Sequence, residues 1–119
     1  MFKINRKVVK ALEALGWNVS EYDTYYEFEN WSPAGEDLVE SYDKDRAIVE
    51  WAGDLVDNFD VDDHVAMWIE AKQNGMGGVP SIRCLLNDAE KIEQMYNEVY
   101  DAIIDNATED DEDEEEDED

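Results

Sequence analysis

WNVSEYDTYYEFENWSPAGEDLVESY, residues 17–42, contains three segments with the composition of β-strands. The first two, residues 17–22 and 24–31, are rich in aromatic and β-branched side chains that alternate with polar ones. Such alternation is typical of strands that bury one face and expose the other. Only Asp23 separates the two segments, so a tight turn is expected to join them as antiparallel neighbours.

A second turn and a third strand complete the predicted sheet. Ser-Pro-Ala-Gly at 32–35 places proline at the second position of a type I turn, where proline is favoured. Residues 37–42 then form a short third strand. Aromatic and acidic side chains alternate along the second strand and are expected on opposite faces: Tyr26 and Phe28 on one face, Glu27 and Glu29 on the other.

Four further segments have apolar residues at helical spacing behind a side chain that can cap a helix. They run from Asn5 to about Leu15, from Asp43 to about Asn58, from Asp62 to about Gln73, and from Ser81 to about Asp105. The order α-β-β-β-α-α-α predicts an α+β fold. In this fold a small three-stranded antiparallel sheet carries about four helices on one face.

The first and last predicted helices have clear apolar stripes. Val8, Leu12 and Leu15 share one face of the first helix. The stripe of the last helix consists of Leu85, Ala89, Ile92, Tyr96, Val99 and Ile103. Cys84 lies beside this stripe and is expected in the core, without the basic neighbours that would make it a reactive thiolate.

The chain is expected to form a single domain over residues 1–106, followed by a disordered acidic tail over residues 107–119. Eleven consecutive carboxylates, residues 109–119, end the sequence. Such a run repels itself and has no apolar side chain to bury, which favours disorder.

The charge of the remaining chain is also strongly negative. The whole chain has 34 acidic residues against 9 basic ones, and 23 acids remain when the last eleven residues are left out. The acids are segregated, because residues 1–12 and 71–87 contain none. A large field of one sign opposes folding and therefore suggests a use. The expected partner is a basic protein surface, such as that of a nucleic-acid-binding protein, whereas direct binding to nucleic acid or to an anionic membrane is not expected.

The composition suggests that the protein is cytoplasmic. The chain has one cysteine and no apolar run of about 18 residues, so neither an intrachain disulfide nor a membrane span is expected. Adaptation to high salt is an alternative reason for the acidity. It is disfavoured because lysine outnumbers arginine and because asparagine and isoleucine are frequent, which is typical of a low-GC bacterium.

Enzymatic chemistry and a dedicated metal or cofactor site are not expected. The chain has a single histidine, His64, which is interpreted as a surface or cap-proximal residue in the first turn of a helix. The acidic run at 54–63 fails the EF-hand pattern. Counted from Asp60, the sixth residue is Val65 where glycine is required, and the twelfth is Ala71 where glutamate is required.

Acidic residues between 27 and 63 form the predicted partner-binding site. Same-face residues of a strand lie about 6.8 Å apart, twice the rise of about 3.4 Å per residue. Helical neighbours at i, i+3 and i, i+4 lie about 5–6 Å apart. Both spacings approximate a row of phosphates, which carry one charge per about 3.4 Å along one strand. The predicted phosphate mimics are Glu27, Glu29, Asp43, Glu50, Asp54, Asp57, Asp60, Asp62 and Asp63.

The glycine-rich loop at residues 75–80 is the alternative docking surface. It lies in the acid-free segment between Lys72 and Arg83 and offers two apolar side chains, Met76 and Val79. It matches neither the P-loop nor the dinucleotide-binding pattern. If this loop bound the partner, the protein would be an adaptor with an apolar contact, and its charge would serve solubility.

Three stretches carry a resemblance to known proteins: SPAGED at 32–37, FDVDDHVAMWIEAK at 59–72 and GVPSIRCLLNDAEKI at 78–92. They resemble small uncharacterised acidic proteins of phages and mobile elements of Gram-positive bacteria. In size, acidity and acidic tail the chain is also similar to phage DNA-mimic antirestriction proteins. That likeness implies inhibition of a host-defence protein, a restriction enzyme or a CRISPR effector, and allows a homodimer. It assigns no residue to a site.

Overall fold

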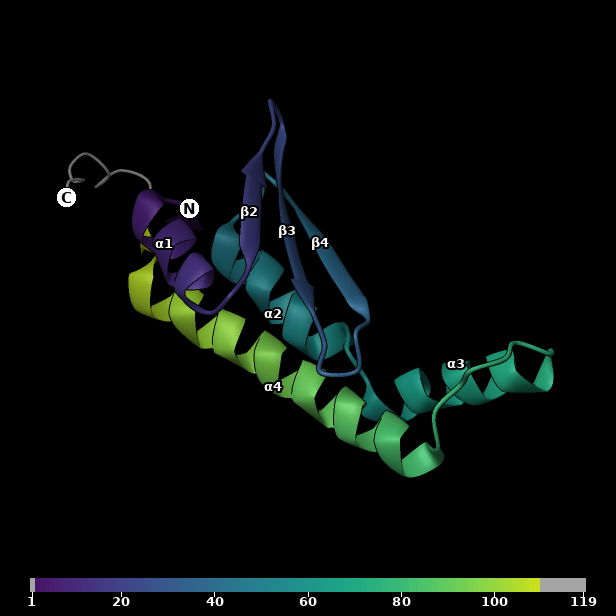
Figure 1. Cartoon of the computed structure of the whole chain (residues 1–119). Coiled ribbons are helices and arrows are strands. Elements are labelled where there is room, and N and C mark those ends of the chain that lie inside the picture. Colours follow the sequence, from purple (N-terminus) through teal and green to yellow (C-terminus); the bar gives the residue numbers. More distant parts are fainter. Residues whose placement is uncertain (1, 110–119) are drawn as a thin grey trace.

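The computed structural model describes residues 2–109 and confirms the predicted α+β class (Figure 1). Its main sheet has the antiparallel order β2-β3-β4. These strands are β2 (Asn18–Glu21), β3 (Tyr25–Trp31) and β4 (Asp37–Asp43). A second pair, β1 (Phe2–Lys3) with β5 (Thr108–Glu109), brings the two ends of the described chain together and was not predicted.

The four helices follow the predicted order. They are α1 (Arg6–Ala14), α2 (Ile48–Asn58), α3 (Val61–Gln73) and α4 (Ile82–Asn106). Asn5 caps α1 through a bond from the Val8 N–H, and Gly16 follows it with a φ of 101°, a left-handed conformation that favours glycine. Ser81 caps α4 as expected, by accepting a bond from the Cys84 N–H.

The core lies between one face of the sheet and helices α1, α2 and α4 (Figure 1). Phe28, Leu38 and Tyr42 enter it from the sheet and meet Trp51 of α2. The predicted stripe of α4 is buried in full, because 25 residues of helix give it a continuous face along the molecule. The other face of the sheet carries no helix in the part of the chain that the structure describes.

Helix α3 projects from one end of this body and packs mainly on the first turns of α4 (Figure 1). A smaller apolar cluster lies between the two helices, with Val65, Leu85 and Ala89 buried at its centre. The described molecule is elongated as a result, with extents of 53 × 23 × 22 Å. The contacts of α3 with α4 and with the β3–β4 turn therefore decide where α3 lies.

Two helix starts differ from the prediction. Helix α2 begins at Ile48 and not near Asp43, because Asp43 still pairs with Tyr25 in the sheet. The Asp43 side chain accepts a bond from the Asp45 N–H, which closes a turn instead of capping a helix. Helix α3 is capped by Asp60 and not by Asp62, since the Asp60 side chain accepts hydrogen bonds from the backbone N–H groups of Asp62 and Asp63.

Three further expectations are corrected by burial and by pairing. Cys84 is exposed, because its position in the first turn of α4 points away from the α3 contact. Leu15 is 39% exposed, since the helix has ended there and the chain turns into β2. The tail does not begin at residue 107: Ala107 packs on the core and the backbone pairs up to Glu109. The predicted disorder of residues 110–119 lies outside the described residues.

No helix within residues 2–109 combines the length and the apolar character needed to cross a membrane.

Candidate functional site

The uncovered face of the sheet carries a group of acidic side chains, which we call the open face. Phe28, Leu38 and Tyr42 point into the core, so alternation places their strand neighbours outward. The outward residues of β3 and β4 include four acids: Glu27, Glu29, Asp37 and Asp43. No outward residue of β2, β3 or β4 is basic. The open face is therefore negative without internal compensation.

Glu29 and Asp37 interact across the two strands of the open face. A hydrogen bond with Asp37 and the negative charge of Asp37 together raise the pKa of Glu29 above its ordinary value. The two carboxylates therefore concentrate negative charge in a small area and oppose each other's ionisation. Asp37 was absent from the predicted set, although the turn at residues 32–35 places it opposite Trp31 at the start of β4.

Aromatic side chains border the open face at both ends. Tyr22 and Tyr25 stack with ring centroids 4.7 Å apart beside the β2–β3 turn. Trp31 at the other end of β3 is 53% exposed. Exposed tyrosine and tryptophan are the residue types that most often anchor a protein interface. The face thus combines charge with anchors for contact.

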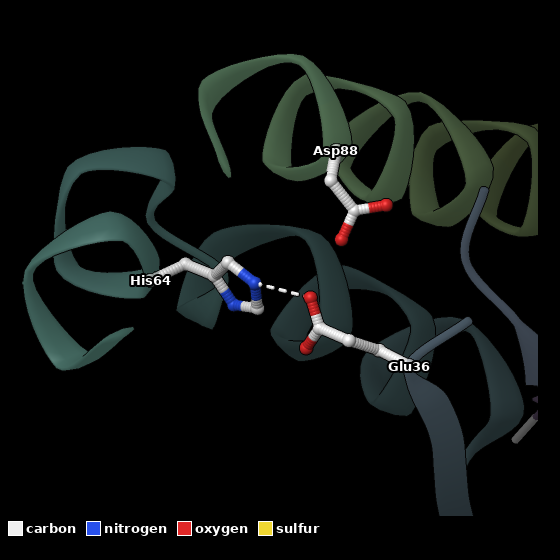
Figure 2. Close-up of side chains that lie close together, drawn as sticks. All are labelled: Glu36, His64 and Asp88. Carbon is white, nitrogen blue, oxygen red and sulfur yellow. Dashed lines mark hydrogen bonds and ion pairs between the residues drawn. The ribbon is translucent and has the colours of Figure 1, made fainter. Parts of the chain in front are cut away.

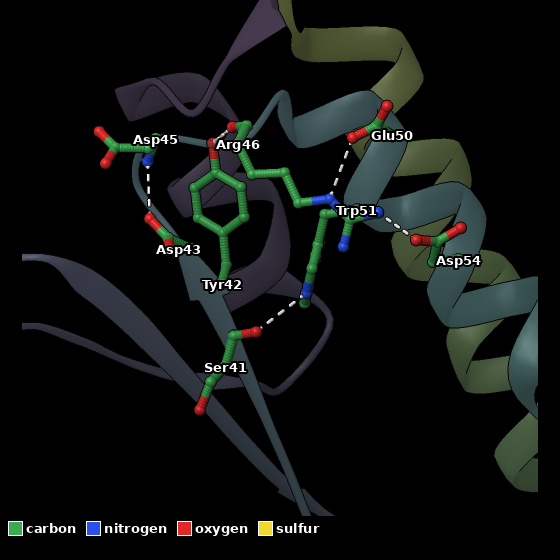
Figure 3. A network of polar contacts seen from close by, with 8 residues as sticks. All are labelled: Ser41, Tyr42, Asp43, Asp45, Arg46, Glu50, Trp51 and Asp54. Carbon is green, nitrogen blue, oxygen red and sulfur yellow. Dashed lines mark hydrogen bonds and ion pairs between the residues drawn. The ribbon is translucent and has the colours of Figure 1, made fainter.

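The helical acids of the predicted set lie on the other side of the sheet. Arg46 contacts two of them: its Nε is 3.1 Å from Glu50 Oε1, and its guanidinium also pairs with Asp54 (Figure 3). The charge of these two carboxylates is thus partly compensated, unlike that of the open face. The remaining helical acids, Asp57, Asp60, Asp62 and Asp63, are exposed around the α2–α3 junction.

The nine predicted phosphate mimics therefore do not form a single row. The sheet separates Glu27, Glu29 and Asp43 from the six acids of the helical side. Sequence spacing described each strand or helix correctly but did not say which face of the sheet the helices cover. Of the nine, Glu27, Glu29 and Asp43 lie on the open face together with Asp37, where no outward basic side chain compensates their charge.

Glu40 is an acid that the prediction passed over. It faces inward on β4 and accepts a hydrogen bond of 2.8 Å from the Tyr96 hydroxyl. Both residues line a shallow groove of about 340 Å³ between β4, α2 and α4. Burial raises the pKa of Glu40, and the bond from Tyr96 opposes this rise only in part.

A second polar site joins three elements at the base of α3, and we call it the junction cluster: Glu36, His64 and Asp88 (Figure 2). Glu36 ends the β3–β4 turn, His64 lies in the first turn of α3, and Asp88 lies in the second turn of α4. One ligand atom from each lies within 4.8 Å of the others, and His64 Nε2 is 2.9 Å from Glu36 Oε2.

The junction cluster is shielded from solvent. Asp88 is 4% exposed, and the side chains of His64 and Glu36 are 10% and 20% exposed. The imidazole also packs against Phe59, with ring centroids 5.6 Å apart. His64 does lie next to the cap of α3, but the expectation of a surface position was wrong, because the first turn of α3 lies against the β3–β4 turn and α4.

Asp88 is held in place by the β3–β4 turn. Its two carboxylate oxygens accept from the Ser32 hydroxyl at 3.1 Å and from the Ala34 N–H at 3.0 Å. Ser32 Oγ in turn accepts from the Glu36 N–H at 3.1 Å. The turn SPAGE at 32–36 is thereby attached to α4, and Glu36 is directed toward His64.

The charge balance of the junction cluster is unusual. Within residues 2–109, no lysine or arginine pairs with either carboxylate, and the imidazole of His64 contacts Glu36. Burial, together with a hydrogen bond to Asp88, raises the pKa of Glu36. Although burial opposes ionisation of Asp88, hydrogen bonds from Glu36, Ser32 and Ala34 lower its pKa. The surroundings of Asp88 thus favour its ionised form, whereas those of Glu36 oppose ionisation.

One sequence signal could have located this cluster. Asp88 stands in the apolar stripe of α4, one turn after Leu85 and one turn before Ile92. An acid at a stripe position is expected to have a specific buried partner. The partner itself could not be identified from the sequence, since Ser32 is 56 positions away.

Comparison with known proteins adds no relative to these observations: no protein-family model, no curated protein and no solved structure matches the chain.

Proposed function

We propose that this protein is a non-enzymatic inhibitor that presents the open face to a DNA-binding protein in place of DNA. The observation that carries the proposal is the group of four outward carboxylates, Glu27, Glu29, Asp37 and Asp43, without a basic residue among the outward side chains of β2–β4. A target with a phosphate-binding groove would lose access to DNA while this face occupies the groove.

The charge density of the molecule supports this proposal. The described residues hold 24 of the 34 acids and all nine bases, a net charge of −15 along a length of 53 Å. That is about one net charge per 3.5 Å, close to the value of about 3.4 Å for one strand of DNA. Same-face carboxylates along β3 add a local spacing of about 6.8 Å, twice the strand rise.

The target would be a DNA-binding protein of host defence in the cytoplasm, such as a restriction enzyme or a CRISPR effector. Long-range attraction would bring the basic groove to the open face and speed association. Exposed Trp31 and the Tyr22–Tyr25 pair would then supply close contact at its two ends. Affinity is expected to fall steeply with salt, because the attraction is between charges.

A second candidate function is supported by the tip formed by α3, the glycine-rich loop and the start of α4. Several large apolar side chains are exposed there: Met67, Met76, Ile82 and Leu86. Met76 of the predicted docking loop is 53% exposed, whereas Val79 is half-buried against α3 and α4. An adaptor that binds through this tip would be insensitive to salt and to the acids of the open face.

The experiment compares two variants of equal net charge. The first neutralises the open face with Glu27→Gln, Glu29→Gln, Asp37→Asn and Asp43→Asn. The second neutralises four exposed acids of α4 with Glu90→Gln, Glu93→Gln, Glu98→Gln and Asp101→Asn. Each is titrated against purified restriction enzymes and CRISPR effectors that are bound to labelled duplex DNA.

The proposal predicts that the wild type displaces DNA from at least one of these enzymes, that the α4 variant retains most of this activity, and that the open-face variant loses it. Equal activity of both variants would exclude the open face as the binding surface. Loss of binding in Met76→Ser with Met67→Ser, while the open-face variant stays active, would favour the adaptor function.

A further inference from the structure

The junction cluster has the donor set of a metal site. It combines one imidazole nitrogen with two carboxylates, supplied by the β3–β4 turn, α3 and α4. Three protein ligands of these types, with solvent in the remaining position, suit Zn²⁺. In Figure 2 the three side chains converge on one small volume from three different elements.

The distances are close to those that Zn²⁺ requires. Bonds of about 2.0–2.2 Å to nitrogen and oxygen in a tetrahedron place neighbouring ligand atoms about 3.3–3.5 Å apart. His64 Nε2 and Glu36 Oε2 are 2.9 Å apart, and no pair in the cluster exceeds 4.8 Å. Movements of the ligand atoms by about 1 Å would therefore bring them to the separations that Zn²⁺ requires.

Outer contacts hold at least one ligand in position. Asp88 accepts from the Ser32 hydroxyl and the Ala34 N–H, so its carboxylate is oriented before any ion binds. Metal-binding carboxylates are commonly oriented by such partners, and loss of one weakens metal binding about 10–100-fold. The lone pairs that these donors leave free remain available to a cation.

The charge of the junction cluster also favours a bound cation. Two shielded carboxylates need positive charge, and no Lys or Arg within residues 2–109 pairs with them. A divalent cation with neutral His64 brings the cluster to zero net charge. Buried charges are tolerated when they are paired or bind a metal. A hard cation such as Mg²⁺ prefers oxygen ligands, whereas an imidazole nitrogen is a preferred ligand of Zn²⁺.

We propose that Glu36, His64 and Asp88 bind one Zn²⁺ ion, which attaches α3 to the β3–β4 turn and to α4. The ion would join the three elements at the contacts on which the position of α3 depends, with solvent in its remaining position. It would fix the projecting tip relative to the open face. This inference is independent of the proposed function, since it concerns residues of neither binding surface.

The single histidine of the chain makes a direct test available. Tag-free protein labelled with ¹³C gives one imidazole Cε1–H resonance, which reports on His64 alone. Zn²⁺ is expected to move this resonance to a new position that is complete at one molar equivalent, and EDTA is expected to reverse the change. Mg²⁺ and Ca²⁺ at the same concentration should leave it in place. Zn²⁺ should also raise the thermal unfolding midpoint.

Two variants separate the site from diffuse binding to an acidic surface. Glu36→Gln removes a ligand but can still accept a hydrogen bond, and it should weaken Zn²⁺ binding at least about 10-fold. Asp62→Asn with Asp63→Asn changes two exposed acids in the same turn as His64 and should bind Zn²⁺ as the wild type does. A His64 resonance that Zn²⁺ does not move, or that drifts without saturation near one equivalent, would overturn the proposal. That titration uses the wild type, so it stands even if Glu36→Gln fails to fold.

Discussion

Tyr96 of α4 donates a hydrogen bond of 2.8 Å to the inward-facing carboxylate of Glu40 on β4, and this contact joins the sheet to the longest helix. It lies at the centre of the molecule, where Trp17 and Phe59 pack against the Tyr96 ring. An acidic group in such surroundings makes the stability of the fold depend on pH.

Stability is expected to rise on mild acidification because of Glu40. Burial raises its pKa in the folded state above the ordinary value of 4.5. The folded protein therefore binds the proton more tightly than the unfolded chain does. The stabilising contribution is complete below about pH 4.5 and is lost as pH rises through the higher folded value. Urea unfolding of wild type and Glu40→Gln across this range tests the point.

Glu40→Gln should flatten the pH dependence, because glutamine accepts the Tyr96 bond without ionising. Glu90→Gln, at an exposed position on α4, is the matched control and should keep the slope of the wild type. An unchanged slope in Glu40→Gln would show that other carboxylates govern the acid response.

Asp37→Asn should stabilise the protein at neutral pH and low salt. Asp37 raises the pKa of Glu29 through a hydrogen bond and through its charge, so the two carboxylates oppose one another when both are ionised. Salt screens this repulsion, and the gain should shrink as the salt concentration rises. Thermal unfolding at low and high salt measures both effects. A loss of stability in Asp37→Asn at low salt would contradict this explanation.

Trp51→Phe should destabilise the fold by about 1–3 kcal/mol. The indole Nε1 donates a bond of 3.0 Å to the Ser41 carbonyl (Figure 3). The ring also packs against Phe28 and Tyr42. Phenylalanine keeps much of the packing but leaves the carbonyl without its donor, which costs about this much when the site is buried. Trp51→Ala should cost more, about 3–5 kcal/mol, since it also creates a cavity. Denaturant unfolding of both variants gives the comparison.

Asn5→Ala should cost about 0.5–2 kcal/mol, the usual range for loss of an N-cap. The Asn5 side chain accepts from the Val8 N–H and also donates to the Asn106 carbonyl at the end of α4. Asn5→Asp separates the two roles, because aspartate can cap the helix but cannot donate. If Asn5→Asp unfolds as readily as Asn5→Ala, the contact with Asn106 outweighs the cap.

Local patterns accounted for the strands and helices. Alternation in β3 and the apolar stripe of α4 each depend on neighbours within a few positions, and both were predicted correctly. The start of α2 was not, because two local preferences compete at Asp43. Its side chain can cap a helix or close a turn, and the ladder with Tyr25 decides for the turn.

The candidate sites were predictable only in part for the same reason. Spacing alone placed Glu27 and Glu29 on one face of a strand, since the period of two is a property of the chain. It could not show that Asp37 joins them while Asp54 lies across the sheet beside Arg46. Those relations depend on the pairing register and on the face that the helices cover.

The sequence by itself determined the order of the four helices and of strands β2–β4, the buried stripe of α4 and the excess of negative charge, because each follows from residue types and short-range periodicity. Only the tertiary structure decided that His64 meets Glu36, 28 positions away, and that both meet Asp88. That meeting requires the first turn of α3 to pack beside α4 while the β3–β4 turn is attached to Asp88. Long-range packing of apolar faces brings these segments together, and no local pattern records which polar side chains will then become neighbours.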